Sequence, residues 1–136
     1  MRGLEVEPAS SVPIWSQIEE AVRRLVASGA LPAGAPIPSV RDLARDLRVN
    51  PATVAKAYQR LADQGILAVR RGEGTYVAEE PPTLSRPQRD RLLQDGASRY
   101  ANLAASIGAS RNEASEKLRD AFERIDGDGS RKRRSP

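Results

Sequence analysis

PSVRDLARDLRVNPATVAKAYQRLADQGILAVRRGEGTYV, residues 38–77, is the stretch that decides the fold. Its apolar residues recur at helical spacing in two short segments that a tight turn separates. Ser39 is placed to cap the first helix, and Asn50 to cap the second, which has Pro51 at its first helical position. Gly65 is typical of the left-handed residue that ends a helix. The stretch therefore predicts two short helices joined by a tight turn.

A helix and a hairpin flank this helical pair. Apolar residues recur at helical spacing between residues 13 and 28, with charged side chains, Glu19 among them, on the opposite face. After the pair, β-prone runs at 66–69 and 75–77 bracket RRGEG, which predicts a small hairpin with a glycine-rich tip. Residues 1–11 are interpreted as a short lead-in. The expected fold is mainly α with a small β hairpin.

The rest of the chain is interpreted as a linker, two helices and a tail. Residues 79–87 are rich in proline, 88–126 return to helical periodicity, and 127–136 are expected to be a disordered basic tail. Two such helices cannot enclose a core of normal size, so we expect a second copy of the chain to cover them. The alternative is that they fold back on their own N-terminal domain. The candidate dimerisation residues are Leu92, Leu93, Tyr100, Leu103, Ala104, Ile107, Leu118, Phe122 and Ile125.

Composition removes most catalytic and metal chemistry. The 136 residues include no cysteine and no histidine, so the usual zinc ligands, the commonest general base and the most reactive nucleophile are all absent. We therefore expect no enzyme, no metal and no cofactor. No apolar run approaches the length of a membrane span, and the N-terminus has acids where a signal peptide has its apolar segment. The expectation is a cytoplasmic protein without membrane contact.

The helical pair carries side chains suited to double-stranded DNA. A helix fits the major groove when a second helix holds it at a fixed angle. Asn50, Thr53 and Lys56 lie three apart on one face of the second helix; Asn favours adenine, Lys can reach guanine, and the Thr methyl can meet thymine. Glycines in the hairpin let its backbone approach DNA closely. The candidate DNA-binding residues are Ser39, Arg41, Arg45, Asn50, Thr53, Lys56, Gln59, Arg60, Arg70, Arg71, Gly72 and Gly74.

These assignments have structural alternatives. Ser39 and Asn50 would cap their helices whether or not DNA is bound. A solvated helix face would account for the polar side chains of the second helix, and a tight hairpin needs glycine for its turn in any case. Tyr58 is interpreted as a core residue rather than a base contact. The order and spacing of the whole set is what favours DNA.

Four separated motifs carry a resemblance to a known family. PIW and QI within 13–18, PSVRDLA at 38–44, VNPATVAKAY at 49–58 and RRGEGTYV at 70–77 closely resemble the GntR family of bacterial transcription regulators. The resemblance implies a winged helix-turn-helix domain over residues 11–78. Pro51-Ala52 departs from the pattern of several branches, which have basic or hydroxyl residues there, so the base read at this point is left open. The positions that match operator contacts of the family are Ser39, Arg41, Thr53, Lys56, Arg71 and Gly74.

The length after Val77 separates the branches of that family. Most members carry a large effector domain, whereas 59 residues follow Val77 here. The chain is most similar to the YtrA-like branch, whose small helical tail serves for dimerisation. Such regulators often repress operons that encode ABC transporters and lie within the operon they control. The resemblance therefore implies a homodimeric repressor of its own operon on an inverted-repeat operator, with the small-molecule effector unknown.

Two other functions remain open from the residues alone. A nonspecific architectural DNA-binding protein would show a steep salt dependence and little preference between sequences. A winged helix used only for protein contacts would not need Lys56 or Arg71. The charge distribution argues against the architectural protein, because four basic side chains and one acid in the last ten residues account for most of the net charge of +4.

Overall fold

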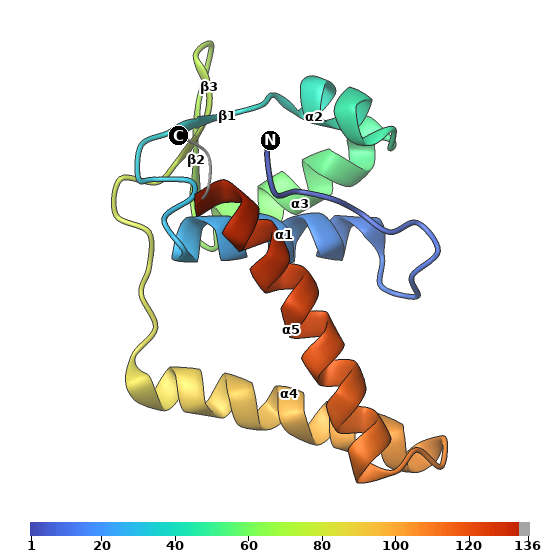
Figure 1. Ribbon diagram of the computed structural model, residues 1–136. Coiled ribbons are helices and arrows are strands. Elements are labelled where there is room, and N and C mark those ends of the chain that lie inside the picture. The colour runs from blue at the N-terminus through green and yellow to red at the C-terminus, as the bar shows by residue number, and fades with distance from the viewer. Residues whose placement is uncertain (134–136) are drawn as a thin grey trace. The chain divides into compact units, whose positions relative to one another are not determined.

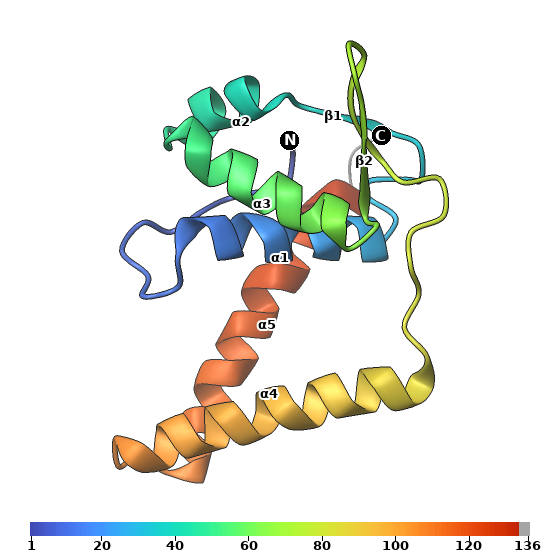
Figure 2. The same ribbon diagram turned by 180° about the vertical axis from the view of Figure 1, so that it is seen from behind.

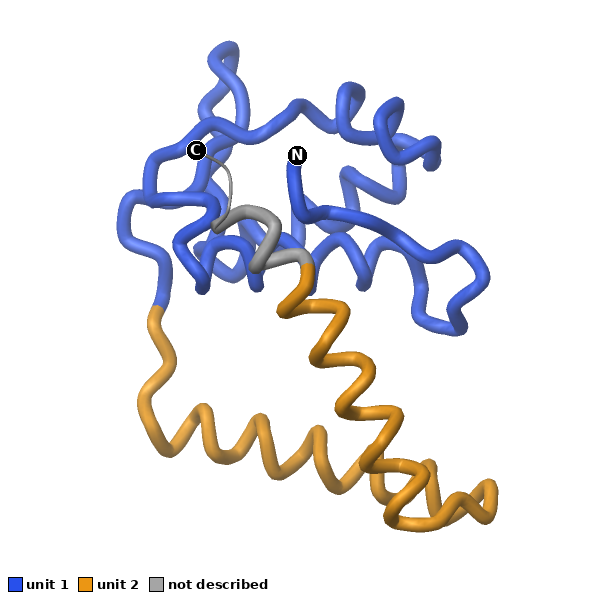
Figure 3. The backbone as a smooth tube through the Cα atoms, viewed as in Figure 1, with its two compact units in different colours: residues 1–82 blue, residues 83–136 orange. Residues whose placement is uncertain are grey.

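A computed structural model describes the backbone of residues 1–133 and the side chains of residues 1–127. The chain divides into two compact units (Figure 3), the winged unit, residues 1–82, and the helical unit, residues 83–136. Within the described residues, no helix is both long enough and apolar enough to cross a membrane.

Three helices form most of the winged unit (Figure 1): α1 Ile14–Ala27, α2 Val40–Leu47 and α3 Pro51–Asp63. The bounds of all three lie close to those expected from apolar spacing and from the caps. α2 ends at Arg48, whose backbone is left-handed with a φ of 58°. This residue turns the chain sharply, and α3 starts three residues later. The expected pair of helices with a tight turn is confirmed.

The sheet of the winged unit has one strand more than expected. β2 Leu67–Arg70 and β3 Gly74–Val77 form the expected hairpin, and β1 Pro36–Ile37 adds to the other edge of β3, giving the order β1-β3-β2 with antiparallel pairing throughout. Proline suits this short edge strand because it cannot donate to a ladder. Ile37 is buried and fastens the segment before α2 to the sheet. The mainly α fold with a small sheet is confirmed.

The core of the winged unit collects the apolar stripes of its three helices and the inner face of the sheet. The largest fully buried side chains are those of Ile18, Val22, Leu43, Val54, Leu61 and Val77. Leu4 is also buried in this core, and the side chain of Gln17 hydrogen-bonds the backbone of Glu7 and Val12. The interpretation of residues 1–11 as a lead-in outside the domain is therefore wrong. One isolated leucine in a polar segment gives no periodic signal that would have placed it in the core.

The helical unit consists of α4 Arg86–Ser106 and α5 Arg111–Arg133. A reciprocal capping box between Ser85 and Gln88 starts α4, so the last two residues of the expected linker, 86 and 87, already belong to the helix. α5 is described as far as Arg133 and so takes in part of the segment that was expected to be a disordered tail. Residues 134–136 of the expected tail lie outside the described residues. The basic residues that suggested a solvated tail are themselves good helix formers.

Candidate nucleic-acid interface

The helix-turn-helix and the hairpin reach the same edge of the winged unit. In both Figure 1 and Figure 2, α2 and the tip of the β2–β3 hairpin lie at the upper edge, with α1 below them. The tip turns through Gly72 and Gly74, whose φ angles of 77° and 126° lie in the region that favours glycine. The arrangement is that of a winged helix-turn-helix, in which a helix and a wing can contact one duplex together.

The two cap residues use their side chains within the protein. The hydroxyl oxygen of Ser39 accepts a hydrogen bond from the backbone N–H of Asp42 at 3.0 Å, and the amide oxygen of Asn50 accepts one from the N–H of Ala52 at 2.9 Å. Their role as caps is therefore confirmed. The first turn of α3 leaves no amide free for DNA, because Pro51 has no N–H and the N–H groups of Thr53 and Val54 donate to the carbonyl oxygen of Asn50. The first amides of α2 have no partner within the helix, and such amides suit phosphate oxygens.

Several predicted DNA-binding side chains already have partners inside the protein. Their hydrogen bonds and ion pairs occupy donors or charge that a DNA contact would need, and Arg70 also lies over an aromatic ring. The contacts are Arg45 to Asp42 at 3.2 Å and to Asp46 at 3.9 Å, Gln59 to Asp63 at 2.8 Å, Arg60 to Glu19 at 2.7 Å, and Arg70 to Glu79 at 3.7 Å and to the ring of Tyr76 at 4.5 Å from its centroid. Arg60 is the most firmly engaged, because its partner is buried. These four residues stay predictions as DNA contacts, and each would first have to leave a partner.

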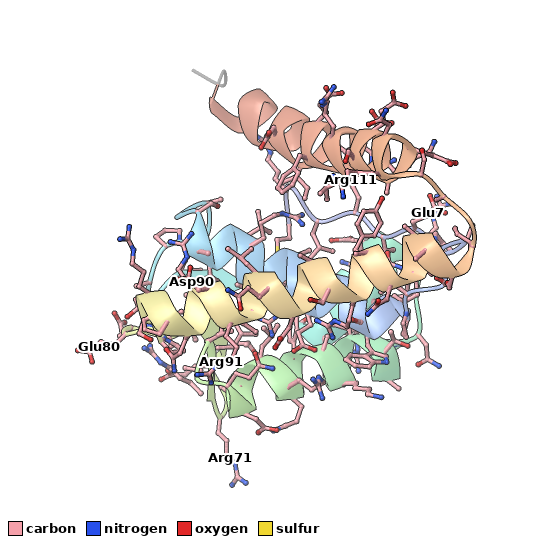
Figure 4. The ribbon with its side chains drawn as sticks, turned by 90° about the horizontal axis from the view of Figure 1, so that it is seen from below. Glu7, Arg71, Glu80, Asp90, Arg91 and Arg111 are labelled. Carbon is pink, nitrogen blue, oxygen red and sulfur yellow. The ribbon has the colours of Figure 1, made fainter. Side chains whose placement is uncertain are left out.

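Three predicted cations have no acidic partner among the described residues: Arg41 on α2, Lys56 on α3 and Arg71 at the tip of the hairpin. All three are exposed. Figure 4 shows the side chain of Arg71 extending clear of the ribbon. Lys56 lies over the ring of Trp15, with its Nζ atom 4.4 Å from the ring centroid. Thr53, the remaining predicted base contact, lies on α3 and is half-buried.

One carboxylate that was expected on the solvated face of α1 is buried in the structure. Glu19 of α1 is 5% exposed, although it was expected among the solvated charges. It accepts hydrogen bonds from Arg60 at 2.7 Å, from Gln64 at 2.7 Å and from Arg23 at 2.8 Å. Burial on its own would raise the pKa of Glu19, but the hydrogen bonds from these three side chains outweigh it, so the pKa lies below its ordinary value. Glu19 thereby fastens α1 to the C-terminal half of α3.

Tyr58 and the segment before α2 complete the frame of the interface. The ring of Tyr58 is buried, and its hydroxyl donates a hydrogen bond to the carbonyl oxygen of Pro38 at 2.8 Å. Burial raises the pKa of Tyr58 above its ordinary value, so the hydroxyl keeps its proton and remains a donor. The interpretation of Tyr58 as a core residue is confirmed, and its hydroxyl holds the start of α2 against α3.

The predicted dimerisation residues fall into two groups. Tyr100 and Ala104 contribute to the packing of α4 on α5: the hydroxyl of Tyr100 donates to the carbonyl oxygen of Ala114 at 2.7 Å, and Ala104 is buried. The other seven are between 41% and 72% exposed within one chain: Leu92, Leu93, Leu103, Ile107, Leu118, Phe122 and Ile125. The described residues include no group of His, Cys, Asp and Glu that could hold a metal ion.

Fold and site together define a winged helix-turn-helix module for DNA. The family described as bacterial regulatory proteins of the gntR family matches residues 15–77. The chain is 33% identical over 111 residues to the HTH-type transcriptional regulator Rv1152 of Mycobacterium tuberculosis, covering 82% of this chain and 87% of that protein. The chain belongs to the GntR family, whose members are DNA-binding transcription regulators and not enzymes.

Further similarities point to one branch of the family. The chain is 41% identical over 80 residues to the HTH-type transcriptional repressor YtrA of Bacillus subtilis, which covers 59% of this chain and 62% of that protein. The match therefore spans less than two thirds of that relative. The solved structure of YtrA from Sulfolobus acidocaldarius, a GntR-family transcription factor, is 30% identical with a TM-score of 0.57, covering 71% of this chain and 98% of that one. These similarities place the chain in the YtrA-like branch.

Proposed function

We propose that the chain is a homodimeric repressor that binds an inverted-repeat operator. The winged unit is the reading head, and the exposed apolar side chains of the helical unit form the dimer contact. The repressor acts in the cytoplasm on its own operon, with genes of an ABC transporter as the expected targets, as the YtrA-like branch implies. Its relative from Bacillus subtilis is named a repressor. No effector is assigned.

The DNA-reading role is supported by the distribution of the three predicted cations that have no acidic partner among the described residues. Arg41, Lys56 and Arg71 come from α2, α3 and the hairpin, so each of the three elements that would face a duplex contributes one. A helix-turn-helix needs backbone contacts beside the groove as well as contacts within it, and a wing adds contacts further along the duplex. Three cations on three elements match that requirement.

The charge of the winged unit favours sequence reading over bulk attraction. Residues 1–82 contain ten basic and ten acidic side chains, so the unit has no net charge. Nonspecific architectural binding draws its affinity from a large excess of positive charge. The winged unit lacks that excess. Its DNA affinity must therefore depend on where Arg41, Lys56 and Arg71 lie and not on bulk charge.

The helical unit supports dimerisation through the seven exposed apolar side chains of α4 and α5. Burying such a side chain contributes about 1.5–3 kcal/mol. A monomer that left all seven in water would carry an unusually rich apolar surface for a soluble protein. A second copy can bury both sets at once in a two-fold contact, in which the same residues serve on both sides.

DNA binding is tested by footprinting the full chain on genomic fragments from around its own gene. Protection of two inverted half-sites, about one helical turn or a multiple of it apart, is the expected result. Lys56→Ala and Arg71→Ala should weaken the protection, whereas Glu5→Ala, an exposed change on the N-terminal segment, should not. Equal affinity for the protected fragment and a scrambled duplex would favour the architectural protein, and no binding at moderate salt would defeat the proposal.

Dimerisation is tested by sedimentation velocity of Leu103→Asp in the full chain. The added carboxylate cannot be buried in an apolar contact without a large cost, so the variant should sediment as a monomer and lose most operator affinity. Asn102→Asp adds the same charge at the neighbouring exposed position and should remain a dimer. A monomeric wild type, or a dimeric Leu103→Asp, would mean that the apolar side chains of the helical unit serve another purpose.

A further inference from the structure

Trp15 connects the first helix to the predicted reading face of α3. It occupies the second position of α1 and is half-buried. Two cations of α3, one helical turn apart, lie over its ring. Lys56 Nζ is 4.4 Å and Arg60 Cζ is 4.8 Å from the ring centroid. Both distances fall within the range of cation–π attraction, and tryptophan offers the strongest such attraction of the aromatic residues.

The two cations differ in what else they contact. Arg60 donates from its Nε atom to the buried carboxylate of Glu19, so its charge is compensated inside the protein. Lys56 forms no hydrogen bond or ion pair with any residue in the described part of the chain. The Trp15 ring is therefore the contact that determines where the Lys56 ammonium lies.

A ring and a carboxylate hold an ammonium in different ways. A carboxylate neutralises the charge and accepts one or two of its three N–H groups. An aromatic face attracts the charge through its quadrupole and leaves those N–H groups available as donors. Lys56 is thus held in position while its donors remain open. Arg45 pairs with carboxylates, and Arg70 pairs with a carboxylate as well as lying over the Tyr76 ring, so both differ from Lys56 in having an acidic partner.

We propose that Trp15 is a positioning residue for DNA recognition, which orders Lys56 before binding and presents its ammonium to an acceptor on DNA. A free lysine side chain loses most of its rotational freedom when it is fixed on a ligand, and that loss lowers affinity. The Trp15 ring restricts Lys56 already in the free protein, so less freedom is lost on binding. This inference rests on the proposed DNA-reading function. The acceptor is a guanine edge or a phosphate oxygen, both of which accept from an ammonium.

The test is a double-mutant cycle on DNA affinity with the full chain. Wild type, Trp15→Leu, Lys56→Ala and the double variant are titrated against a duplex containing the footprinted site and against a scrambled duplex of the same composition. Leucine keeps apolar packing and removes the π face, whereas Trp15→Phe keeps a weaker one. Thermal unfolding followed by circular dichroism checks that each variant is folded, because replacing Trp15 removes the tryptophan fluorescence.

Trp15→Leu should lower affinity for the footprinted duplex by roughly three- to tenfold, with Trp15→Phe between it and the wild type. In the Lys56→Ala background the same change should have almost no further effect. The salt dependence then identifies the acceptor. If Lys56 binds a phosphate, Lys56→Ala reduces the slope of log affinity against log salt by about one; if it binds a base, it relaxes preference at one base pair.

Three results would overturn the role of Trp15 while leaving the proposed function intact. Trp15→Leu could bind as tightly as the wild type, could lose the same factor with and without Lys56, or could bind more tightly. The second result means that Trp15 only packs, and the third means that the ring holds Lys56 away from DNA. A wild type with no preference for the footprinted duplex would instead defeat the proposed function, and this inference with it.

Discussion

Replacing Glu19 by glutamine should destabilise the winged unit strongly, although the two side chains have nearly the same size and shape. The carboxylate accepts from Arg60, Gln64 and Arg23 at 2.7, 2.7 and 2.8 Å, whereas an amide keeps one acceptor oxygen and turns an NH2 group toward the remaining donors. Removing one partner of a fully buried ion pair costs about 3–5 kcal/mol. The two arginine side chains are 46% and 48% exposed, so water can solvate them again. We expect a loss of about 2 kcal/mol in the free energy of unfolding.

The same substitution should change how stability depends on pH. The pKa of Glu19 in the folded protein lies below its ordinary value of 4.5. A lowered carboxyl pKa contributes stability above pH 4.5, and this contribution is lost as the pH falls through the folded pKa. Glutamine does not titrate. The difference in the free energy of unfolding between wild type and Glu19→Gln should therefore be largest near neutral pH and should decrease below pH 4.5.

Urea unfolding of the full chain measures both effects. Trp15 is the one tryptophan of the chain and lies in the winged unit, so its fluorescence reports the unfolding of that unit. A loss of about 2 kcal/mol corresponds to a melting temperature lower by about 8–16 °C. Glu20→Gln, at the exposed neighbouring position, is the matched control and should change stability by less than about 0.5 kcal/mol. An unchanged midpoint for Glu19→Gln at neutral pH, or a gap that persists at acidic pH, would refute the reasoning.

Three further predictions concern the frame of the reading face, and the same urea titration measures them. Tyr58→Phe removes the hydrogen bond to the Pro38 carbonyl and should cost about 1 kcal/mol; no loss would mean that water replaces the hydroxyl. Arg48→Gly relieves a left-handed backbone and should stabilise the unit by about 0.5–1 kcal/mol, unless the Arg48 side chain makes a compensating contact. Leu4→Ala should cost about 2–3 kcal/mol, and a neutral result would remove the N-terminal segment from the core.

Local rules predicted the helical frame well. Ser39 and Asn50 cap their helices, and Gly65 follows α3, as expected. Caps depend on residues three or four positions apart, and such short-range patterns can be read from one sequence. The glycines of the hairpin tip were predictable for the same reason, because the backbone there needs positive φ.

Contacts between distant residues were not predictable in this way. β1 pairs Pro36 with Tyr76, residues far apart in the chain, and two residues carry no period from which a strand could be inferred. Glu19 was one of four charged residues on the same expected face of α1, and its partners Arg60 and Gln64 lie more than forty positions further along the chain. Helical periodicity gives the polar face of a helix, but not which polar residue a neighbouring helix covers.

The same limit applies to the candidate interface. From the sequence, six cations of the helical pair and the hairpin were predicted to bind DNA, because any of them could reach it: Arg41, Arg45, Lys56, Arg60, Arg70 and Arg71. The structure separates Arg45, Arg60 and Arg70, which have carboxylate partners, from Arg41, Lys56 and Arg71, which have none among the described residues. The role of Trp15 had a signal in the sequence, an aromatic residue at the start of α1, but its target became visible only when α1 and α3 were packed together.

The absence of net charge on the winged unit supports the proposed pairing of two reading heads. One head with few open cations releases few counterions on binding, so its affinity for any single half-site is low. Joining two heads makes the second contact intramolecular, and this can raise overall affinity by about 10²–10⁴-fold when both half-sites fit. A more basic winged unit would bind DNA without a partner, but it would bind nonspecific DNA almost as tightly as the operator. In the proposed dimer, two neutral heads would gain affinity only where two half-sites have the correct spacing, so geometry would select the operator.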